Sequence, residues 1–214
     1  MQAFKRFNLI PATLLPFCLL PGSAGAAESV WPCASNAPSL QVEVRHEGGP
    51  GLSPATRAYV TAGTNKFAFQ LPVGFRLETA DPQKVTLVSA DYNSLLTWRI
   101  LGPVPSETPE LASAACRELL MERHPGGKII EEFTLPSLGG RGPAFDVRWN
   151  ATGGGPRDER IVFIPALAGV LEFSLVSSPE KFKTAQPELD TLLLTMRASD
   201  ANGKLVVPVL SDKL

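Results

Sequence analysis

Few residues in this chain have both the type and the spacing that catalysis or metal binding requires. The two histidines, His46 and His124, lie far apart, and neither has the short-range cysteine, histidine or acidic neighbours of a zinc site. His124 follows a predicted helix, where its charge suits the helix dipole. Glu131 and Glu132 are adjacent in a predicted strand and point to opposite faces, so they cannot share one proton. We therefore expect no metal site and no paired-carboxylate catalysis.

Two further kinds of catalytic motif are missing from the sequence. The chain has no Gly-x-Ser-x-Gly segment of the kind that presents a hydrolase nucleophile. The glycine runs at 139–142 and 153–155 lack the Lys-Ser/Thr pair of a phosphate-binding loop, and they are predicted to be turns between strands. We predict that the protein is not an enzyme and has no catalytic residue and no cofactor. A secreted hydrolase is a remote alternative.

The first 26 residues have the three parts of a secretory signal peptide. Lys5 and Arg6 form a basic start, residues 9–20 are apolar, and small residues lead to a cleavage site at Ala26 or the residue after it. The apolar run is too short to span a bilayer, which needs about 20 residues. The sequence predicts an exported protein, periplasmic or extracellular, with no transmembrane segment in its mature form.

Removal of the signal peptide leaves two of the three cysteines, Cys33 and Cys116. Exported proteins fold where disulfides form, so we expect a Cys33–Cys116 bond, for which chain-entropy arguments give about 4–5 kcal/mol of stabilisation. Two free thiols, with Cys116 buried on its helix, are the alternative. Cys18 lies in the apolar run without the Leu-Ala-Gly-Cys type of context, so a lipoprotein is a minor alternative.

The composition is that of a neutral, turn-rich globular chain. The net charge is -1 over 214 residues, so no electrostatic argument exists for binding nucleic acid or an anionic membrane surface. The 20 prolines and 18 glycines predict many turns, which suits a β-rich protein better than a helical bundle. The length accommodates one domain with extensions.

Alternating apolar residues predict a mostly antiparallel β structure. In the segment that begins at Gly169, Leu171 and Phe173 face one side, whereas Glu172 and Ser174 face the other and belong to no predicted site. Short glycine-rich turns join this segment to the two strands before it, which makes an antiparallel meander. The predicted strands are 40–45, 67–71, 75–79, 85–89, 95–101, 128–135, 144–150, 160–165 and the segment from 169.

Two amphipathic helices are predicted to cover the sheet. The first runs over 109–123, with Thr108 as its N-cap and Pro109 at its first position, and it ends at a His-Pro-Gly-Gly run. The second follows the Ser-Ser-Pro turn after the last strand, and its apolar residues share one face as far as Met196. The expected fold class is α+β, with a mostly antiparallel sheet and two flanking helices.

The regular pattern begins at about residue 66 and divides the chain into four parts. These are a signal peptide (1–26), an N-terminal arm (27–65), an α/β domain (66–198) and a C-terminal tail (199–214). Trp31 in the arm is a candidate anchor for a partner, because tryptophans often dominate the energy of interfaces.

Several local motifs resemble those of the PsbP-like and DcrB-like proteins. Residues 67–75, Phe-Ala-Phe-Gln-Leu-Pro-Val-Gly-Phe, resemble their opening strand and turn, and residues 138–145 resemble the glycine turn before their C-terminal meander. Residues 169–197 resemble their closing strand and helix, although Pro187 and Met196 depart from that pattern. The resemblance covers about residues 66–198.

The resemblance implies a fold and a broad function. These families are small exported or thylakoid-lumen proteins with an α/β/α sandwich, which a Ran-binding nuclear protein shares, and most members are non-enzymatic accessory or assembly factors. We accordingly expect an exported binding, assembly or envelope accessory protein whose partner is an unidentified protein or small ligand. The alternative is a protein that binds a small ligand or lipid in a cavity between helix and sheet.

Overall fold

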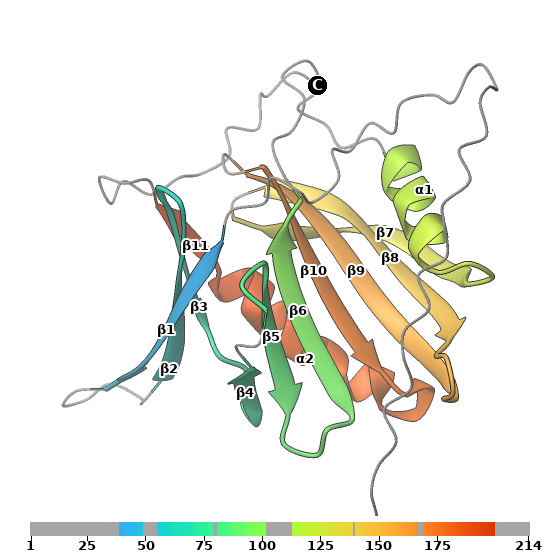
Figure 1. Cartoon of the computed structure of the whole chain (residues 1–214), viewed down its shortest axis with the longest axis horizontal. Helices are drawn as coiled ribbons and strands as arrows, with labels where there is room; N and C mark the ends of the chain where they lie inside the picture. The colour runs from blue at the N-terminus through green and yellow to red at the C-terminus, as the bar shows by residue number, and fades with distance from the viewer. Residues whose placement is uncertain are drawn as a thin grey trace, which may run out of the picture.

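The computed structural model describes residues 39–48, 55–78, 81–101, 113–138, 140–166 and 169–199, which form two antiparallel sheets and two helices. Figure 1 shows the smaller sheet at the left and the larger sheet in the centre and at the right. The predicted signal peptide with its Ala26 cleavage site, Trp31, Cys33 and the tail from residue 200 lie outside the described residues. The α+β class and the mostly antiparallel strands are confirmed.

The larger sheet has seven strands in the order β4-β5-β6-β10-β9-β8-β7. Its last four strands along the chain are also neighbours in the sheet, which confirms the predicted meander. The strands are β4 (Phe75–Glu78), β5 (Lys84–Ser89), β6 (Ser94–Ile100), β7 (Lys128–Ser137), β8 (Gly140–Asn150), β9 (Pro156–Ala166) and β10 (Gly169–Ser177).

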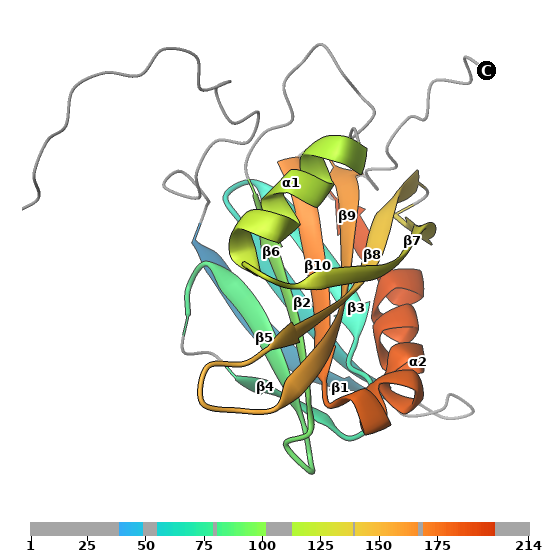
Figure 2. The ribbon, with the colours of Figure 1, turned by 90° about the vertical axis from the view of Figure 1, so that its right-hand side faces the viewer.

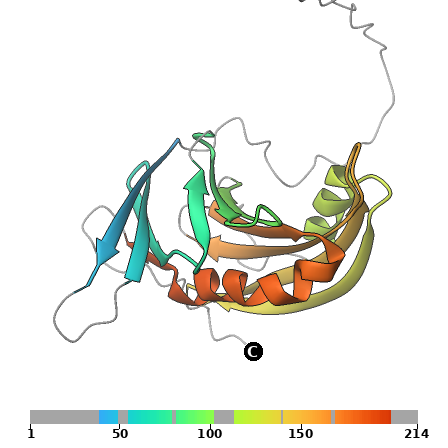
Figure 3. The same cartoon turned by 90° about the horizontal axis from the view of Figure 1, so that it is seen from below.

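A second sheet, which the sequence did not predict, stands beside the first (Figure 3). It has the order β1-β2-β3-β11, from β1 (Leu40–Glu47), β2 (Ala55–Ala62), β3 (Asn65–Gln70) and β11 (Arg197–Ser199). The predicted domain start at residue 66 falls inside β3, and residues assigned to the arm supply Leu40, Ala58 and Val60 to the main core. The described part of the arm is therefore built into the domain.

The two helices, α1 (Ser113–Arg123) and α2 (Pro179–Thr195), cover opposite faces of the larger sheet (Figure 2). Neighbouring strand residues point to opposite faces, and Ile161 packs with α1 residues whereas Val162 packs with α2 residues. The predicted start of the first helix, at Pro109, lies outside the described residues. Neither helix in the described ranges has the length and apolar character needed to cross a membrane.

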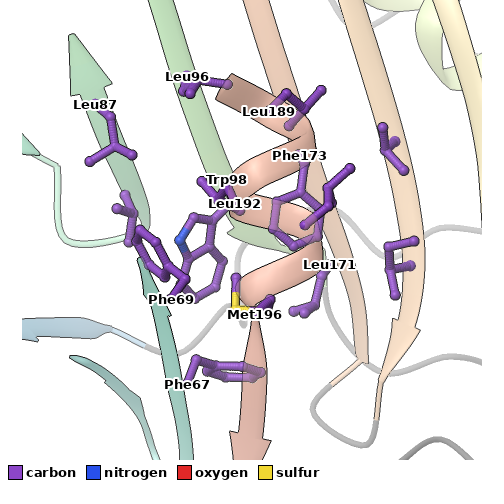
Figure 4. Close-up of a cluster of buried hydrophobic side chains, with 14 of the residues drawn as sticks. Phe67, Phe69, Leu87, Leu96, Trp98, Leu171, Phe173, Leu189, Leu192 and Met196 are labelled. Atoms are coloured by element: carbon purple, nitrogen blue, oxygen red, sulfur yellow. The ribbon is translucent and has the colours of Figure 1, made fainter. Parts of the chain in front are cut away.

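The main core lies between the two sheets and α2, and Trp98 is at its centre (Figure 4). Trp98 is 1% exposed, and the rings of Phe67 and Phe69 meet it edge-on at centroid distances of 5.4 and 6.3 Å. Such aromatic pairs stabilise beyond the area that they bury, by about 0.5–1.5 kcal/mol. Leu189 and Leu192 of α2 pack into the same cluster. Trp98 is therefore a core residue.

Candidate functional site

A buried carboxylate, Glu172, is the centre of a charged cluster on the α1 side of the larger sheet. It lies in the central strand β10 and is 4% exposed. Arg99 of β6 donates to it through Nε and Nη2 at 3.1 and 3.2 Å. Arg123, at the end of α1, donates through Nη1 and Nη2 at 2.9 and 2.6 Å. Burial lowers the pKa of Arg123, but the charge of Glu172, the hydrogen bonds to Glu172 and the charge of Glu159 together raise that pKa by more, so the guanidinium stays charged.

A second buried carboxylate, Glu159 of β9, lies on the same face of the sheet. Ser174 donates its hydroxyl to Oε1 of Glu159 at 2.6 Å. The Nε2 atom of His124 lies 2.9 Å from Oε2 of Glu159, but it is not aligned for a hydrogen bond. The imidazole stacks on Trp149, with ring centroids 4.8 Å apart. His124 therefore connects the end of α1 to the sheet through its packing on Trp149.

The arrangement of these groups is that of a buried polar network and not of a catalytic triad. A serine nucleophile needs its hydroxyl hydrogen-bonded to a base that is open to substrate, whereas Ser174 donates to the buried carboxylate of Glu159. Glu159, Glu172 and Ser174 are each 5% exposed or less, which closes them to a substrate. Within the described ranges, no three His, Cys, Asp or Glu residues gather in a way that could hold a metal ion.

Glu172 and Ser174, expected on a polar strand face that belongs to no site, instead lie in this buried cluster. The reason is that β10 is a central strand covered on both faces, so polar groups on its second face need partners from β6, β9 and α1. The signal in the sequence is the pair of valines, Val170 and Val176, which flank them at two-residue spacing. A strand face with apolar residues at its two ends and polar residues between them therefore indicates a buried ion pair, and not a solvent-exposed polar face.

Two more arginine–carboxylate pairs lie on the α2 side of the meander. Arg160 donates to Asp146 through Nε and Nη2 at 2.7 and 2.8 Å, and Arg148 donates to Asp158 through the same atoms at 2.7 Å. The Arg160 guanidinium lies 4.6 Å from the ring centroid of Phe133. Asp146 is 6% exposed because this face of the sheet is also covered.

An open cleft of about 490 Å³ lies where the small sheet meets β4. It forms at the turn between β3 and β4, and Val73 at this turn is 86% exposed. We call it the β4 cleft. Its apolar lining residues are Val44, Ala55, Leu71, Pro72, Val73, Phe75 and Leu77.

Three of the polar side chains that line the β4 cleft, those of His46, Thr56 and Arg76, have partners within the fold. Nδ1 of His46 lies 2.9 Å from Oγ1 of Thr56. Arg76 donates from Nε to Glu78 at 3.1 Å and from Nη2 to the Tyr92 hydroxyl, and its guanidinium lies 4.4 Å from the Tyr92 ring centroid. The Tyr92 side chain is 67% exposed, which adds an aromatic surface near the cleft. The cleft therefore presents apolar surface among paired charges.

The turn that carries Tyr92 is held by Asp91. Its carboxylate accepts hydrogen bonds from Nδ2 of Asn93 at 2.8 Å, from the Ser89 hydroxyl at 2.7 Å and from the Asn93 amide at 3.1 Å. The Asn93 side chain first, and then Ser89, lower the pKa of Asp91 from 3.8 to about 2. Hydrogen bonds to the charged form have this effect because protonation would break them.

An NMR titration of the side-chain carboxyl carbons should therefore place the midpoint of Asp91 at about pH 2. Because the folded pKa lies below the unfolded one, the stabilisation from Asp91 is present at neutral pH, and it is lost as the pH falls from 3.8 through about 2. The variant Asn93→Ala should move the midpoint upward, because it removes the largest cause of the shift. A wild-type midpoint at an ordinary aspartate value would contradict the described turn.

Cys116, one half of the predicted disulfide, lies in α1 and is 0% exposed. It packs with Leu120, Phe145 and Phe163 in the core on the α1 side. Its predicted partner Cys33 lies outside the described residues, so the bond stays a prediction. A linked Cys33–Cys116 peptide in the mass spectrum of the unreduced protein would confirm it, and two alkylatable thiols would reject it.

In the reduced, folded protein we expect Cys116 to be almost inert towards iodoacetamide. Burial, and then the charges of Glu172 and Glu132, raise the pKa of its thiol from 9.0 to about 12. The reactive species is the thiolate, so alkylation at pH 8 should be about a thousandfold slower than in the unfolded chain. Mass spectrometry of the alkylated Cys116 peptide, with and without urea, measures both rates. Equal rates would contradict the burial of the thiol.

Comparison with known proteins finds a likeness in fold. No protein-family model and no curated protein matches the chain. The structure is similar to the PsbP protein CyanoP of Synechocystis (13% identity, 82% of this chain and 96% of that chain, TM-score 0.42). It is also similar to Mog1 (11% identity, 75% of this chain and 98% of that chain, TM-score 0.47). A third similar structure is LpqN, which is involved in cell envelope biogenesis of Mycobacterium tuberculosis (13% identity, 75% of this chain and 91% of that chain, TM-score 0.38). The solved structures that this chain resembles thus include proteins of the PsbP-like fold that its sequence motifs resemble.

Proposed function

We propose that the protein is an exported, non-enzymatic binding protein of the accessory or assembly kind, and that the β4 cleft is its binding site. The observation that carries the proposal is the cleft itself, which is open, has a volume of about 490 Å³, is lined mostly by apolar groups and lies beside a sheet edge. Ligand sites in proteins measure about 300–1,000 Å³. Export is supported by the basic and apolar segments of residues 1–26.

A non-enzymatic role is supported by the state of the buried charged groups. Glu172 is held by Arg99 and Arg123, and Glu159 is held by Ser174 beside His124. These carboxylates have partners within the fold and are closed to solvent, whereas catalytic acids and bases lie where a substrate can reach them. We infer that the charged cluster on the α1 side of the larger sheet stabilises the fold. The opposite positions of α1 and α2 support the α/β/α sandwich that the sequence motifs imply.

The chemistry of the β4 cleft favours an extended apolar segment of a partner protein. Arg76 is paired with Glu78, so the cleft offers little net charge to an ionic ligand. Val73 is exposed, and Phe75 and Leu77 are half-buried beside it. Apolar surface of this kind gains free energy when a partner removes it from water, at about 25 cal/mol per Å².

The β4 strand also offers backbone hydrogen-bonding groups to such a segment. The Ala90 amide donates to the Gly74 carbonyl at 2.8 Å, and hydrogen-bonded pairs alternate along antiparallel strands. Phe75 and Leu77 therefore direct their backbone groups away from β5, at the edge of the sheet. The Phe75 amide bonds to Pro72, so Leu77 is the residue whose amide and carbonyl suit an added strand.

A small apolar ligand or lipid is the second candidate, and the volume of the same cleft favours it. The site expected between helix and sheet is filled by side chains. Leu189 and Leu192 of α2 pack in one cluster with Phe173 and Trp98, and each of the four is 1% exposed or less (Figure 4). A ligand would therefore occupy the β4 cleft.

Photocross-linking from the cleft tests the proposal. Val73 replaced by p-benzoylphenylalanine, in the full-length protein expressed in its own host, should link to a specific protein on irradiation. Ile130 is the matched control position, because it is 50% exposed and lies in β7, at the opposite edge of the same sheet. A lipid adduct at position 73 would favour the second candidate. The same adducts from both positions, or none from position 73, would contradict a binding role for the cleft.

A further inference from the structure

The outward face of the small sheet has a hollow at Ala68. In the register of the sheet, Ala68 of β3 lies between Tyr59 of β2 and Arg197 of β11, and its short side chain leaves room among longer neighbours. The hollow measures about 150 Å³, smaller than the roughly 300–1,000 Å³ of sites for drug-sized ligands. It accommodates one small group. Its lining residues are Arg57, Ala68, Phe69, Thr195 and Arg197.

Arg197 is held at the hollow by the end of α2. Its Nη1 donates to the carbonyl oxygens of Leu194 at 3.0 Å and Met196 at 2.8 Å. The C-terminal end of a helix favours a cation, because its last carbonyl groups carry partial negative charge. One side of the guanidinium is thereby anchored. Among the described residues, its Nε and Nη2 have no hydrogen-bond partner.

Arg57 reaches the same hollow from β2. Its Nη1 lies 3.4 Å from Oε2 of Glu47, and the two side chains are 49% and 39% exposed, so solvent screens this long contact. Lys66 is exposed on the same face of β3, two residues from Ala68. Two cations, Arg57 and Arg197, thus line the hollow, and Lys66 is a third on the same face. The nearby carboxylates are Glu47 and Glu43, and Glu43 is already paired with Arg45. The local charge is positive on a chain whose net charge is -1.

We propose that the hollow at Ala68 is a binding site for an oxyanion, a carboxylate or phosphate group bridged by Arg57 and Arg197. Two N–H groups of one guanidinium match two oxygens of such a group, and Nε and Nη2 of Arg197 form this pair. The Thr195 side chain lines the hollow. Its hydroxyl is held in place because it donates to the Thr191 carbonyl at 2.7 Å and accepts from the Gln70 amide at 3.1 Å. The site lies on the face of the small sheet opposite to the β4 cleft, so it does not depend on the function proposed for that cleft.

NMR of the full chain, labelled with nitrogen-15, tests this site. The protein is titrated with sodium phosphate and separately with sodium acetate, and sodium chloride keeps the ionic strength constant. We expect saturable shifts of the arginine Nε–H signals of Arg197 and Arg57, with a dissociation constant on the order of 1 mM. Saturation by phosphate alone or acetate alone identifies the group that the site prefers. Saturation by neither overturns the proposal.

Variants assign the shifts to the hollow. R197Q and R57Q should each raise the dissociation constant about tenfold, because each removes charge-assisted hydrogen bonds. R141Q is the matched control, since Arg141 is an exposed arginine of β8 in the other sheet, and binding should be unchanged. Circular dichroism melting verifies that each variant folds, and the wild-type titration decides the proposal even where one does not. Equal weakening in all three variants would show that the anion responds to net charge, which overturns a site at Ala68.

Discussion

Replacement of Glu172 with glutamine, E172Q, is expected to lower the free energy of unfolding by about 3 kcal/mol. Glutamine has nearly the same shape, so the change removes charge and leaves the packing. Arg99 and Arg123 would then lose their shared carboxylate. Their side chains are only 34% and 25% exposed, so water would replace that partner incompletely. Breaking a buried ion pair costs about 3–5 kcal/mol because a charge is left without its partner. The partial exposure of both arginines places the expected effect at the lower end of that range.

Equilibrium unfolding in urea measures this effect, with E122Q as the control. Glu122 lies on α1 near Arg123 and is exposed, so its neutralisation should change the free energy of unfolding by less than about 0.5 kcal/mol. The E172Q protein should also lose amide protection in α1 first, because Arg123 connects that helix to β10. A loss below about 1 kcal/mol for E172Q would contradict a structural role for the cluster.

Replacement of Gly142 with alanine, G142A, is expected to destabilise the protein by about 3 kcal/mol. A Cβ atom at this position would lie 1.6 Å from the carbonyl oxygen of Phe163 and 2.7 Å from its carbonyl carbon. Both atoms belong to the backbone of β9, so relief requires β8 and β9 to separate in the middle of the meander. The close approach of the two strands explains why this position holds glycine.

The control for G142A is G155A, in the turn between β8 and β9. An added Cβ at Gly155 meets nothing within 4 Å, so G155A should change the free energy of unfolding by less than about 0.5 kcal/mol. Thermal melts of the two variants measure the difference. Equal melting temperatures would contradict the close approach at Gly142. The sequence pattern predicts a turn at Gly142, whereas β8 already begins at Gly140.

The regular elements of the larger sheet could be predicted because their alternation reflects real burial. Leu96, Trp98 and Ile100 of β6 are each 1% exposed or less, and large apolar residues at two-residue spacing identify such a strand. β2 could not be found in this way, because two of its inward residues are the alanines Ala58 and Ala62, which give a weak hydrophobic signal. β11 has only 3 residues, too few for any period to be visible.

The candidate sites could not be predicted, because each depends on how distant segments meet. The β4 cleft combines Val44 of β1 with Leu77 of β4, and no periodicity in either strand indicates that the two sheets separate there. The partners of Glu172 come from β6 and α1, so its burial follows from the position of β10 in the sheet order. His46 has no sequence neighbours suited to a zinc site, yet it lies in the lining of the cleft. A single sequence does not reveal this position.

Binding of the cross-linked partner to the purified protein tests the central claim most directly. Isothermal titration calorimetry would compare wild-type protein with V73D, which places a charge at the mouth of the β4 cleft, and with I130D, which places one at the opposite edge of the sheet. Both side chains are exposed, at 86% and 50%, so both variants should fold. We expect V73D to weaken binding at least about tenfold and I130D to leave it unchanged. Equal affinities for wild-type protein and V73D would contradict binding at the β4 cleft.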